Sequence, residues 1–178
     1  SSQGCFDTIV FMLKPIPDPI AFAGNDTSVC KGLGVGLLAS GSLSPSASYQ
    51  WTSIPSGFTS NAQSIIVFPQ QNTQYVVAVS NGPNCPSPTT YDTVLVSVFT
   101  TPVFSLGPDL SICKGDTICL HVYIPGTFNS WSSNPPGFFS TDTSIYISPN
   151  STTNYYLSVI DSICSSIDDI NIVVKSGH

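Results

Sequence analysis

The sequence predicts an all-β fold made of two tandem antiparallel β-sandwiches. The first observation is an internal repeat: the motif G-x-D-x-x-[VI]-C-K-G occurs at 24–32 and again at 107–115. The match continues downstream, where Trp51 and Trp131 occupy one position of the repeat. A period near 80 residues is too long for a solenoid unit and is typical of an array of small domains. The second observation is a series of short β-prone segments without a helical period.

The composition supports strands over helices. All ten acidic residues are Asp and all four basic residues are Lys, so charged residues make up only 8% of the chain, against about a quarter in an average globular protein. The good helix formers Glu and Arg are absent, whereas Val, Ile, Thr, Tyr and Phe, which favour strands, are frequent. The polar surface is therefore expected to come from Ser, Thr, Asn and Gln.

Charge, hydropathy and cysteine content restrict the function. A net charge of −6 argues against nucleic-acid binding, which needs clusters of Lys and Arg. No apolar run approaches the ~18 residues of a membrane span. Six cysteines without a C-x-x-C motif indicate an oxidising, extracellular environment. No signal peptide opens the chain, so we expect it to be an excerpt of a longer protein.

The strands are expected in the same order in both repeats. In the first repeat we expect strands near 27–30, 35–39, 49–51, 64–68, 74–80 and 93–99. In the second repeat we expect them near 110–113, 117–123, 130–132, 144–147, 154–160 and 169–174. Six or seven short strands per repeat are typical of a β-sandwich.

The repeat also predicts the domain boundaries. Residues 1–17 are expected to hold the last strand of a preceding repeat and a Pro-rich junction, because they are similar to the end of the first repeat. That strand is expected to pair with a sheet edge, since an apolar strand left alone is prone to aggregate. The first repeat is expected at 18–99 and the second at 100–178, joined by the very short linker 100–102.

These residues resemble a known family. The shared motif is followed by a Trp, a P-x-G-F turn at 55–58 and 135–138, a Pro before T-x-Y, and a late Cys. This order resembles the PKD-like or immunoglobulin-like repeats of large surface proteins secreted by Bacteroidota, and the resemblance covers almost the whole chain. It implies immunoglobulin-like (PKD-like) sandwiches in extracellular, non-catalytic stalk or adhesin modules, often associated with type IX secretion and gliding motility.

No catalytic residue, cofactor-binding residue or metal ligand is predicted. Gly32, Gly34 and Gly36 superficially resemble a phosphate-binding loop, but a strand rather than a helix follows them. Neither histidine has an aspartate and a nucleophile that can be placed beside it, so no catalytic triad is assigned. Asp168 and Asp169 are neighbours on a strand and therefore face opposite ways, which is poor geometry for paired acid–base catalysis.

Two pairs of repeated residues are given structural roles. Trp51 and Trp131 are expected in the core between the sheets, in preference to an exposed position that would stack on sugar. Asp26 and Asp109 precede the first cysteine of each repeat by four residues. We expect each to accept backbone N–H bonds at a turn, in preference to a Ca²⁺ site, which needs several more oxygen ligands.

Four Asp-Ser/Thr-apolar triplets resemble the O-glycosylation signal of exported Bacteroidota proteins. They place modification sites at Thr8, Thr93, Thr117 and Ser162. The alternative interpretation is that Asp-Thr only begins a strand. A surface chain is compatible with both interpretations.

Four cysteines are disulfide candidates, and two pairings are open. One pairing lies within each repeat, Cys30–Cys85 and Cys113–Cys164, and closes loops of roughly 50 residues. In an immunoglobulin-like strand order those turns lie about 20 Å apart, whereas a disulfide needs Cα atoms within about 7 Å. The other pairing joins Cys30 to Cys164 and leaves the remaining candidates for neighbouring repeats. Cys119 is expected to be unpaired on the outward face of its strand.

We therefore expect a non-catalytic structural or adhesive module of a large bacterial cell-surface protein. Its expected partners are neighbouring repeats of the same chain, further copies of itself, a surface glycan, or a host or prey surface. One alternative is a subunit of a homo-oligomeric extracellular filament, because weakly charged surfaces repel one another little. Another is a carbohydrate-binding module of a secreted hydrolase, which an exposed row of aromatic side chains would distinguish.

Overall fold

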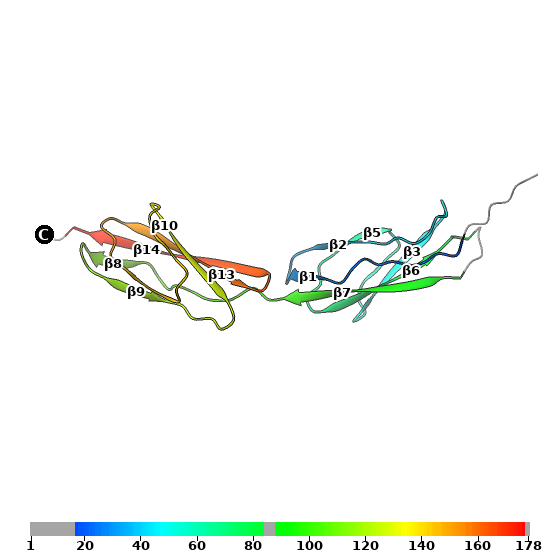
Figure 1. Cartoon of the computed structure of the whole chain (residues 1–178), viewed down its shortest axis with the longest axis horizontal. Helices are drawn as coiled ribbons and strands as arrows, with labels where there is room; N and C mark the ends of the chain where they lie inside the picture. Colours follow the sequence, from blue (N-terminus) through cyan, green and yellow to red (C-terminus); the bar gives the residue numbers. More distant parts are fainter. Residues whose placement is uncertain (1–16, 84–87, 177–178) are drawn as a thin grey trace, which may run out of the picture. The chain divides into compact units, whose positions relative to one another are not determined.

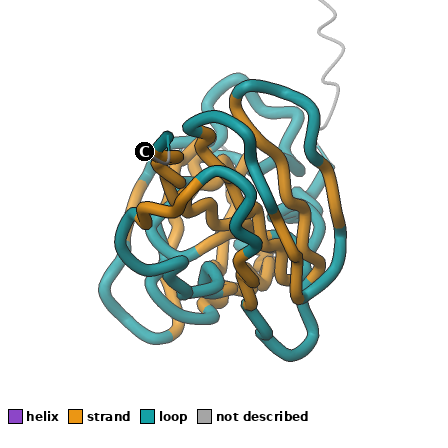
Figure 2. The backbone as a smooth tube through the Cα atoms, turned by 90° about the vertical axis from the view of Figure 1, so that its left-hand side faces the viewer, coloured by secondary structure: helices purple, strands orange, loops and turns teal. Residues whose placement is uncertain are grey.

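The computed structural model describes residues 17–83 and 88–176. Within these ranges the chain consists of strands and loops, drawn in orange and teal in Figure 2. No helix in this part of the chain is long and apolar enough to cross a membrane. The expected all-β fold is confirmed. The strand expected within residues 1–13 lies outside the described residues.

The chain divides into two compact units. The first contains the described residues up to Thr27, together with Val35–Val67 and Thr73–Val96. The second contains Ser28–Gly34, Phe68–Asn72 and the described residues from Ser97 onward. Each unit is built mainly from one copy of the sequence repeat. The boundaries expected from the repeat, at 18–99 and 100–178, stay a prediction.

The first repeat forms a sandwich of two sheets (Figure 1). The larger sheet has the strand order β1-β7-β6-β3-β4, and the smaller one pairs β2 with β5. The strands are β1 (Thr27–Cys30), β2 (Val35–Leu38), β3 (Ser48–Ile54), β4 (Thr59–Ser60), β5 (Ser64–Val67), β6 (Thr73–Ser80) and β7 (Thr90–Phe99). A bridge between Phe22 and Ser40 attaches the segment before β1 to the end of β2. The opening segment therefore contacts the smaller sheet first and the larger sheet afterwards.

The second repeat has the same topology. Its larger sheet has the order β11-β10-β13-β14-β8, and its smaller sheet pairs β12 with β9. The strands are β8 (Leu110–Cys113), β9 (Ile118–His121), β10 (Phe128–Asn134), β11 (Phe139–Ser140), β12 (Ser144–Ile147), β13 (Thr153–Asp161) and β14 (Cys164–Lys175). Strands β8 and β14 run parallel, with Ile112 opposite Val174. The sandwich thus departs from the expected antiparallel pairing where the opening strand meets the closing strand.

The sequence predicted the strands themselves well. Strands β1, β8 and β12 have the expected bounds, and most of the others extend the expected segment by a few residues. The two short strands β4 and β11 were not predicted. Each has only two residues and forms the edge of the larger sheet by pairing with β3 or β10, just after the P-x-G-F turn. Two residues carry no recognisable alternation, so only the tertiary pairing defines these strands.

A tryptophan fills the centre of each sandwich. Trp51 and Trp131 are each 0% exposed. Their indole N–H groups donate to backbone carbonyls, of Ala62 at 3.1 Å and of Asp142 at 2.9 Å, which satisfies the one polar group that burial would otherwise leave unpaired. In the second repeat the tryptophan packs among buried aliphatic and tyrosine side chains: Ile112, Leu120, Val122, Ile145, Ile147, Tyr155, Leu157, Val159, Ile170 and Ile172.

A buried asparagine organises the loop that follows β6. Asn81 is 0% exposed. Its side-chain amide donates to the carbonyl of Pro17 at 3.0 Å, and its side-chain oxygen accepts from the Ser42 hydroxyl at 2.6 Å. Its backbone carbonyl accepts from the Ser44 hydroxyl at 2.8 Å. The next residue, Gly82, has φ +90° and leaves no room for a Cβ against a backbone carbonyl, so this position requires glycine.

We predict that Asn81→Ala destabilises the first unit by about 2–3 kcal/mol, because it leaves the Pro17 carbonyl and the Ser42 hydroxyl, both in part-buried hydrogen bonds, without their partner. Denaturant unfolding followed by tryptophan fluorescence measures the change. The matched control is Asn150→Ala at an exposed loop position, where a change within about 0.5 kcal/mol is expected. Equal effects of the two substitutions would show that the buried asparagine has no special role.

Candidate functional site

Two aspartates in each repeat join the opening segment to the closing strand. In the first repeat, Asp92 on β7 accepts the backbone N–H of Ala23 at 2.8 Å. In the other direction, Asp26 accepts the backbone N–H of Leu95 on β7 at 2.8 Å. We call Asp26 and Asp92 a reciprocal aspartate pair. Together they satisfy backbone donors where the opening segment leaves the smaller sheet for the larger one, as buried or edge N–H groups require.

The second repeat reproduces this reciprocal aspartate pair. Asp168 accepts the backbone N–H of Leu106 at 2.8 Å, and Asp109 accepts that of Asn171 at 3.0 Å. The expectation that Asp26 and Asp109 accept backbone N–H bonds is therefore correct. Their donors lie 69 and 62 residues away, so the bonds join distant strands and not a local turn. The adjacent Asp169 instead accepts from a side chain, that of Asn154, at 2.9 Å.

We predict that Asp168→Ala lowers the free energy of unfolding of the second unit by about 1–2 kcal/mol, because a charge-assisted hydrogen bond to a half-buried backbone N–H is lost. Asp169→Ala is the control on the opposite face of the same strand and is expected to cost less. Thermal unfolding of both variants measures the difference. A larger loss in the Asp169 variant would contradict the proposed role of the pair.

The structure contains a disulfide between Cys30 and Cys164. Their Cα atoms are 5.7 Å apart, and 134 positions separate them in sequence. Cys30 ends β1 of the first repeat, and Cys164 begins β14 of the second. Of the two pairings left open by the sequence, this is the one that joins different repeats. The alternative within the repeats fails because Cys113 carries a free thiol; Cys85 lies outside the described residues.

Cys113 stands in the second repeat where Cys30 stands in the first. The backbone around both is held in the same way: Lys31 N–H donates to the Phe99 carbonyl at 2.8 Å, and Lys114 N–H donates to the Lys175 carbonyl at 3.1 Å. Cys113 is exposed and unbonded. The same scaffold therefore presents a bonded cysteine in one repeat and a free one in the other.

The possible glycosylation positions that the structure describes are exposed. Thr93 lies within β7, Thr117 immediately precedes β9, and Ser162 lies in the turn between β13 and β14 with φ +54°. Among these described positions, only Thr117 fits the alternative that Asp-Thr begins a strand. Thr8 lies outside the described residues.

The three glycines that superficially resembled a phosphate loop do not form one. Gly32 and Gly34 lie in the turn between β1 and β2, and Gly36 lies within β2. A strand follows them, so no helix N-terminus is available to hold a phosphate.

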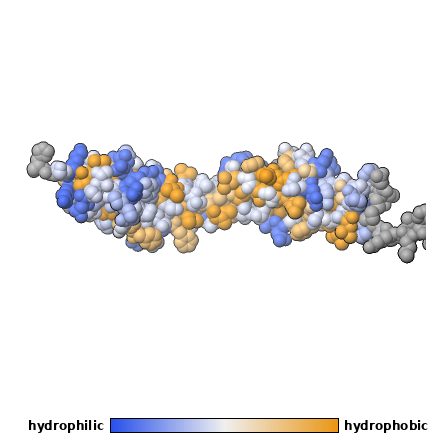
Figure 3. Space-filling model, turned by 90° about the horizontal axis from the view of Figure 1, so that it is seen from above, coloured by the Kyte–Doolittle hydropathy of each residue, from blue (hydrophilic) through white to orange (hydrophobic). Residues whose placement is uncertain are grey.

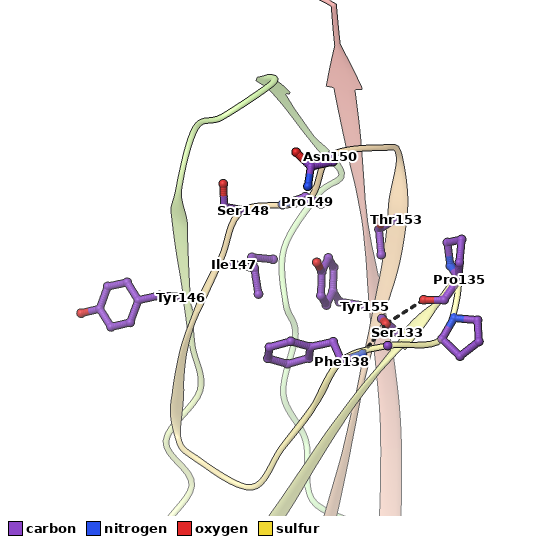
Figure 4. A pocket seen from close by; sticks show the side chains of 12 residues that line it. Ser133, Pro135, Phe138, Tyr146, Ile147, Ser148, Pro149, Asn150, Thr153 and Tyr155 are labelled. Atoms are coloured by element: carbon purple, nitrogen blue, oxygen red, sulfur yellow. Dashed lines mark hydrogen bonds between the residues drawn. The ribbon is translucent and has the colours of Figure 1, made fainter.

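A cavity of about 490 Å³ lies at one end of the second sandwich (Figure 4). The rings of Phe138 and Tyr155 lie in it, whereas the Tyr146 ring points away. Its lining contains prolines, serines and Asn150 but no charged side chain and no histidine or cysteine. Such a lining offers no acid, base or nucleophile beyond hydroxyl groups, so it does not indicate catalysis.

The cavity is lined by a contact between two aromatic rings, and the same contact occurs in both repeats. Phe138 and Tyr155 meet edge to face with ring centroids 5.6 Å apart, and Phe58 and Tyr75 do so at the same distance in the first repeat. Edge-to-face contact is the favourable arrangement of aromatic rings. A pair that recurs in both copies is explained by the architecture and needs no ligand.

Burial raises the pKa of the Tyr75 and Tyr155 hydroxyls above the ordinary value of 10.0. The tyrosines of the unfolded chain ionise first as pH rises, so the contribution of these two hydroxyls to stability is complete below about pH 10 and is lost as pH rises through the raised pKa. We predict that Tyr75→Phe and Tyr155→Phe each reduce this alkaline loss. Unfolding at pH 8 to 11.5 measures it, with the exposed Tyr91→Phe as control. An unchanged alkaline loss in both buried-site variants would contradict the prediction.

The outward face of the smaller sheet in the second repeat carries an unusual set of side chains. Cys119 and His121 lie two residues apart on β9, and both are exposed. Across the pair, Tyr146 lies opposite Cys119, and Ser144 lies opposite His121. The His121 ring nitrogen Nδ1 is 2.6 Å from the Ser144 hydroxyl oxygen. Cys119 faces outward as expected. A metal role for His121 was not predicted, although the spacing of the two residues on a predicted strand was a signal for it.

The surface is weakly polar. In the view of Figure 3, hydrophobic residues in orange, pale weakly polar residues and separate blue hydrophilic patches are interspersed. This matches a chain whose charged residues make up only 8%. Isolated apolar side chains at a surface are ordinary and do not by themselves mark a binding site.

Comparison with known proteins identifies the fold and goes no further. No protein-family model and no curated protein matches the chain. Among solved structures, extracellular domains 3–5 of Drosophila OTK match 91% of this chain over 62% of their own length, with 15% identity and a TM-score of 0.50. A titin variant covering domains I67–I69 matches 89% over 66% of its length, with 12% identity and a TM-score of 0.47.

The insect immune protein hemolin, whose structure is described with implications for homophilic adhesion, matches 88% of the chain with 12% identity and a TM-score of 0.49. The chain spans less than two thirds of the length of these structures. At 15% identity and a TM-score of 0.50, the likeness to the OTK domains shows the fold alone. Together with the observed topology, it defines a tandem of immunoglobulin-like β-sandwiches.

Proposed function

We propose that the chain is a non-catalytic structural or adhesive module of a large bacterial cell-surface protein. The motif that resembles PKD-like repeats of Bacteroidota surface proteins supports this source, and an export route by type IX secretion is part of the proposal. A disulfide favours an extracellular location, because disulfides persist in oxidising compartments.

The observation that carries the proposal is the bond between Cys30 and Cys164. It joins the opening strand of one repeat to the closing hairpin of the next. A covalent bond between repeats contributes nothing to a reaction, but it limits how far the chain can be drawn out by force. At about 3.6 Å per residue, the 134 positions between the cysteines represent about 480 Å of extended chain that the bond withholds. A surface fibre under tension needs such a limit on its extension.

The filament alternative has one observation in its favour. Cys113 has the backbone setting of Cys30 and a free, exposed thiol, so the same bond can be repeated with a further module. The partner is then a neighbouring repeat of the same protein or a copy of this chain in a homo-oligomeric filament.

A carbohydrate-binding module is less well supported. Such modules stack sugars on a row of exposed aromatic rings. Phe128 and Phe139 are exposed at 78% and 71% on the outer face of the larger sheet. Phe139 lies opposite Ser132, four residues along β10 from Phe128, or about 13 Å. Ser130 lies between them on the same face, so the two rings do not form a continuous row.

We also propose O-glycosylation at Thr93, Thr117 and Ser162, which are exposed hydroxyl residues after an aspartate. Thr8 belongs to the same proposal by sequence. A glycan at these positions would add hydrophilic volume to a weakly charged surface.

A single-molecule stretching experiment on the full chain, held at its two ends, tests the structural function. We predict that the wild-type chain releases about 480 Å less length on complete unfolding than the Cys30→Ser/Cys164→Ser variant, because the disulfide bypasses the intervening residues. Cys113→Ser is the control and should behave as wild type. If the oxidised wild-type chain extended as far as the variant without the disulfide, the proposed mechanical role of the bond would be contradicted.

A further inference from the structure

We propose that Cys119 and His121 bind a Zn²⁺ ion that is shared between two copies of this chain. Both side chains lie on the outward face of β9, and both are exposed. Thiolate sulfur and imidazole nitrogen are the two ligand types that tetrahedral zinc sites use most. Cys119 and His121 share a face because they lie two positions apart on one strand. The zinc proposal therefore does not depend on the function proposed above.

The strand spacing suits chelation. Residues two apart on a strand point to the same face, with Cα atoms about 6.6 Å apart. A zinc ion sits about 2.3 Å from a thiolate sulfur and about 2.0–2.1 Å from an imidazole nitrogen. An ion placed above β9 between the two side chains can therefore reach both without a change in the backbone.

The histidine ring already has a hydrogen-bond partner that suits this role. Its Nδ1 is 2.6 Å from the Ser144 hydroxyl on the neighbouring strand β12. Metal-binding histidines usually donate the N–H of one ring nitrogen to such a partner, which fixes the ring and leaves the other nitrogen free to bind metal. With Nδ1–H donating to the Ser144 oxygen, Nε2 carries the free lone pair.

The internal repeat provides a comparison that isolates these residues. At the positions of Cys119, His121 and Tyr146, the first repeat has Gly36, Leu38 and Ile66, as the pairing of Gly36 with Ile66 on β2 and β5 shows. The same sheet thus forms with glycine and two aliphatic residues. The fold does not require the cysteine or the histidine, so their presence together in the second repeat calls for another explanation.

The second copy completes the site. In the described part of the chain, no group of three or more Cys, His, Asp or Glu side chains could hold a metal. Two copies related by a two-fold axis, with their β9–β12 faces opposed, supply two thiolates and two imidazoles, the S₂N₂ set of a closed tetrahedral site. No charged side chain lies on this face of β9 and β12, and the exposed Tyr146, at 75%, gains an apolar contact. Each thiol releases one proton to solvent on binding, and the zinc is neither oxidised nor reduced.

Sedimentation velocity of the full chain with added ZnCl₂ tests the proposal. The expected result is a monomer that becomes a dimer, saturating at about half an equivalent of zinc per chain and reversed by EDTA. Cys119→Gly and His121→Leu, which carry the residues of the first repeat, should remain monomeric. The control Cys113→Ser, which removes the other exposed thiol of the described residues, should still dimerise. Circular dichroism checks that each variant is folded.

A second readout addresses the site itself. Co²⁺ in place of zinc should give the absorption of a tetrahedral thiolate-bound ion, and this should vanish in Cys119→Gly. Ser144→Ala should weaken metal affinity about 10- to 100-fold, as the loss of a histidine's hydrogen-bond partner does. Three results would overturn the proposal: no change in mass with zinc, a zinc-dependent dimer that survives Cys119→Gly, or a dimer that resists EDTA and separates only on reduction.

Discussion

In the first repeat the opening segment passes from the smaller sheet to the larger one, and the reciprocal aspartate pair bonds backbone donors at this crossing. Backbone donors at the crossing cannot all find strand partners, and an unpaired donor costs free energy. Asp26 and Asp92 bond across the crossing in opposite directions, and the second repeat does the same with Asp109 and Asp168. The short Asp side chain suits this role. Bonding these backbone donors is a reason for a chain with so few charged residues to retain aspartate at these positions.

Once the opening strand is fixed beside the closing strand, the position of the first cysteine follows. In both repeats the lysine after that cysteine donates its backbone N–H to the end of the closing strand, at Phe99 or Lys175. The cysteine is thereby held at the end of the larger sheet, away from the closing hairpin of its own repeat. This is why the bond from Cys30 reaches Cys164 of the other repeat. Topology, and not nearness in sequence, selects the disulfide partner.

Much of this arrangement could be predicted from the sequence. Alternation along β6 and the repeated tryptophan were sufficient to predict strands and core, because burial imposes a period that is visible in one dimension. The two-residue strands, the Asn81 loop and the distant donors of Asp26 could not be predicted, since each depends on which segments meet in space. The Cys119–His121 pair was missed for a different reason. His121 was given no metal role, although Cys119 lies two residues away on the same predicted strand.

The two repeats act as controls for one another. Features that recur, such as the tryptophan, the Phe–Tyr contact and the reciprocal aspartate pair, are what any copy needs in order to fold. Features that differ between the two repeats are not needed for the sandwich to fold. The outward face of the smaller sheet differs most sharply in chemistry, with Gly36 and Leu38 in one copy and Cys119 and His121 in the other. A duplicated scaffold can keep its core and acquire a separate surface on each copy. The functional differences of such a chain are therefore expected on its outward faces.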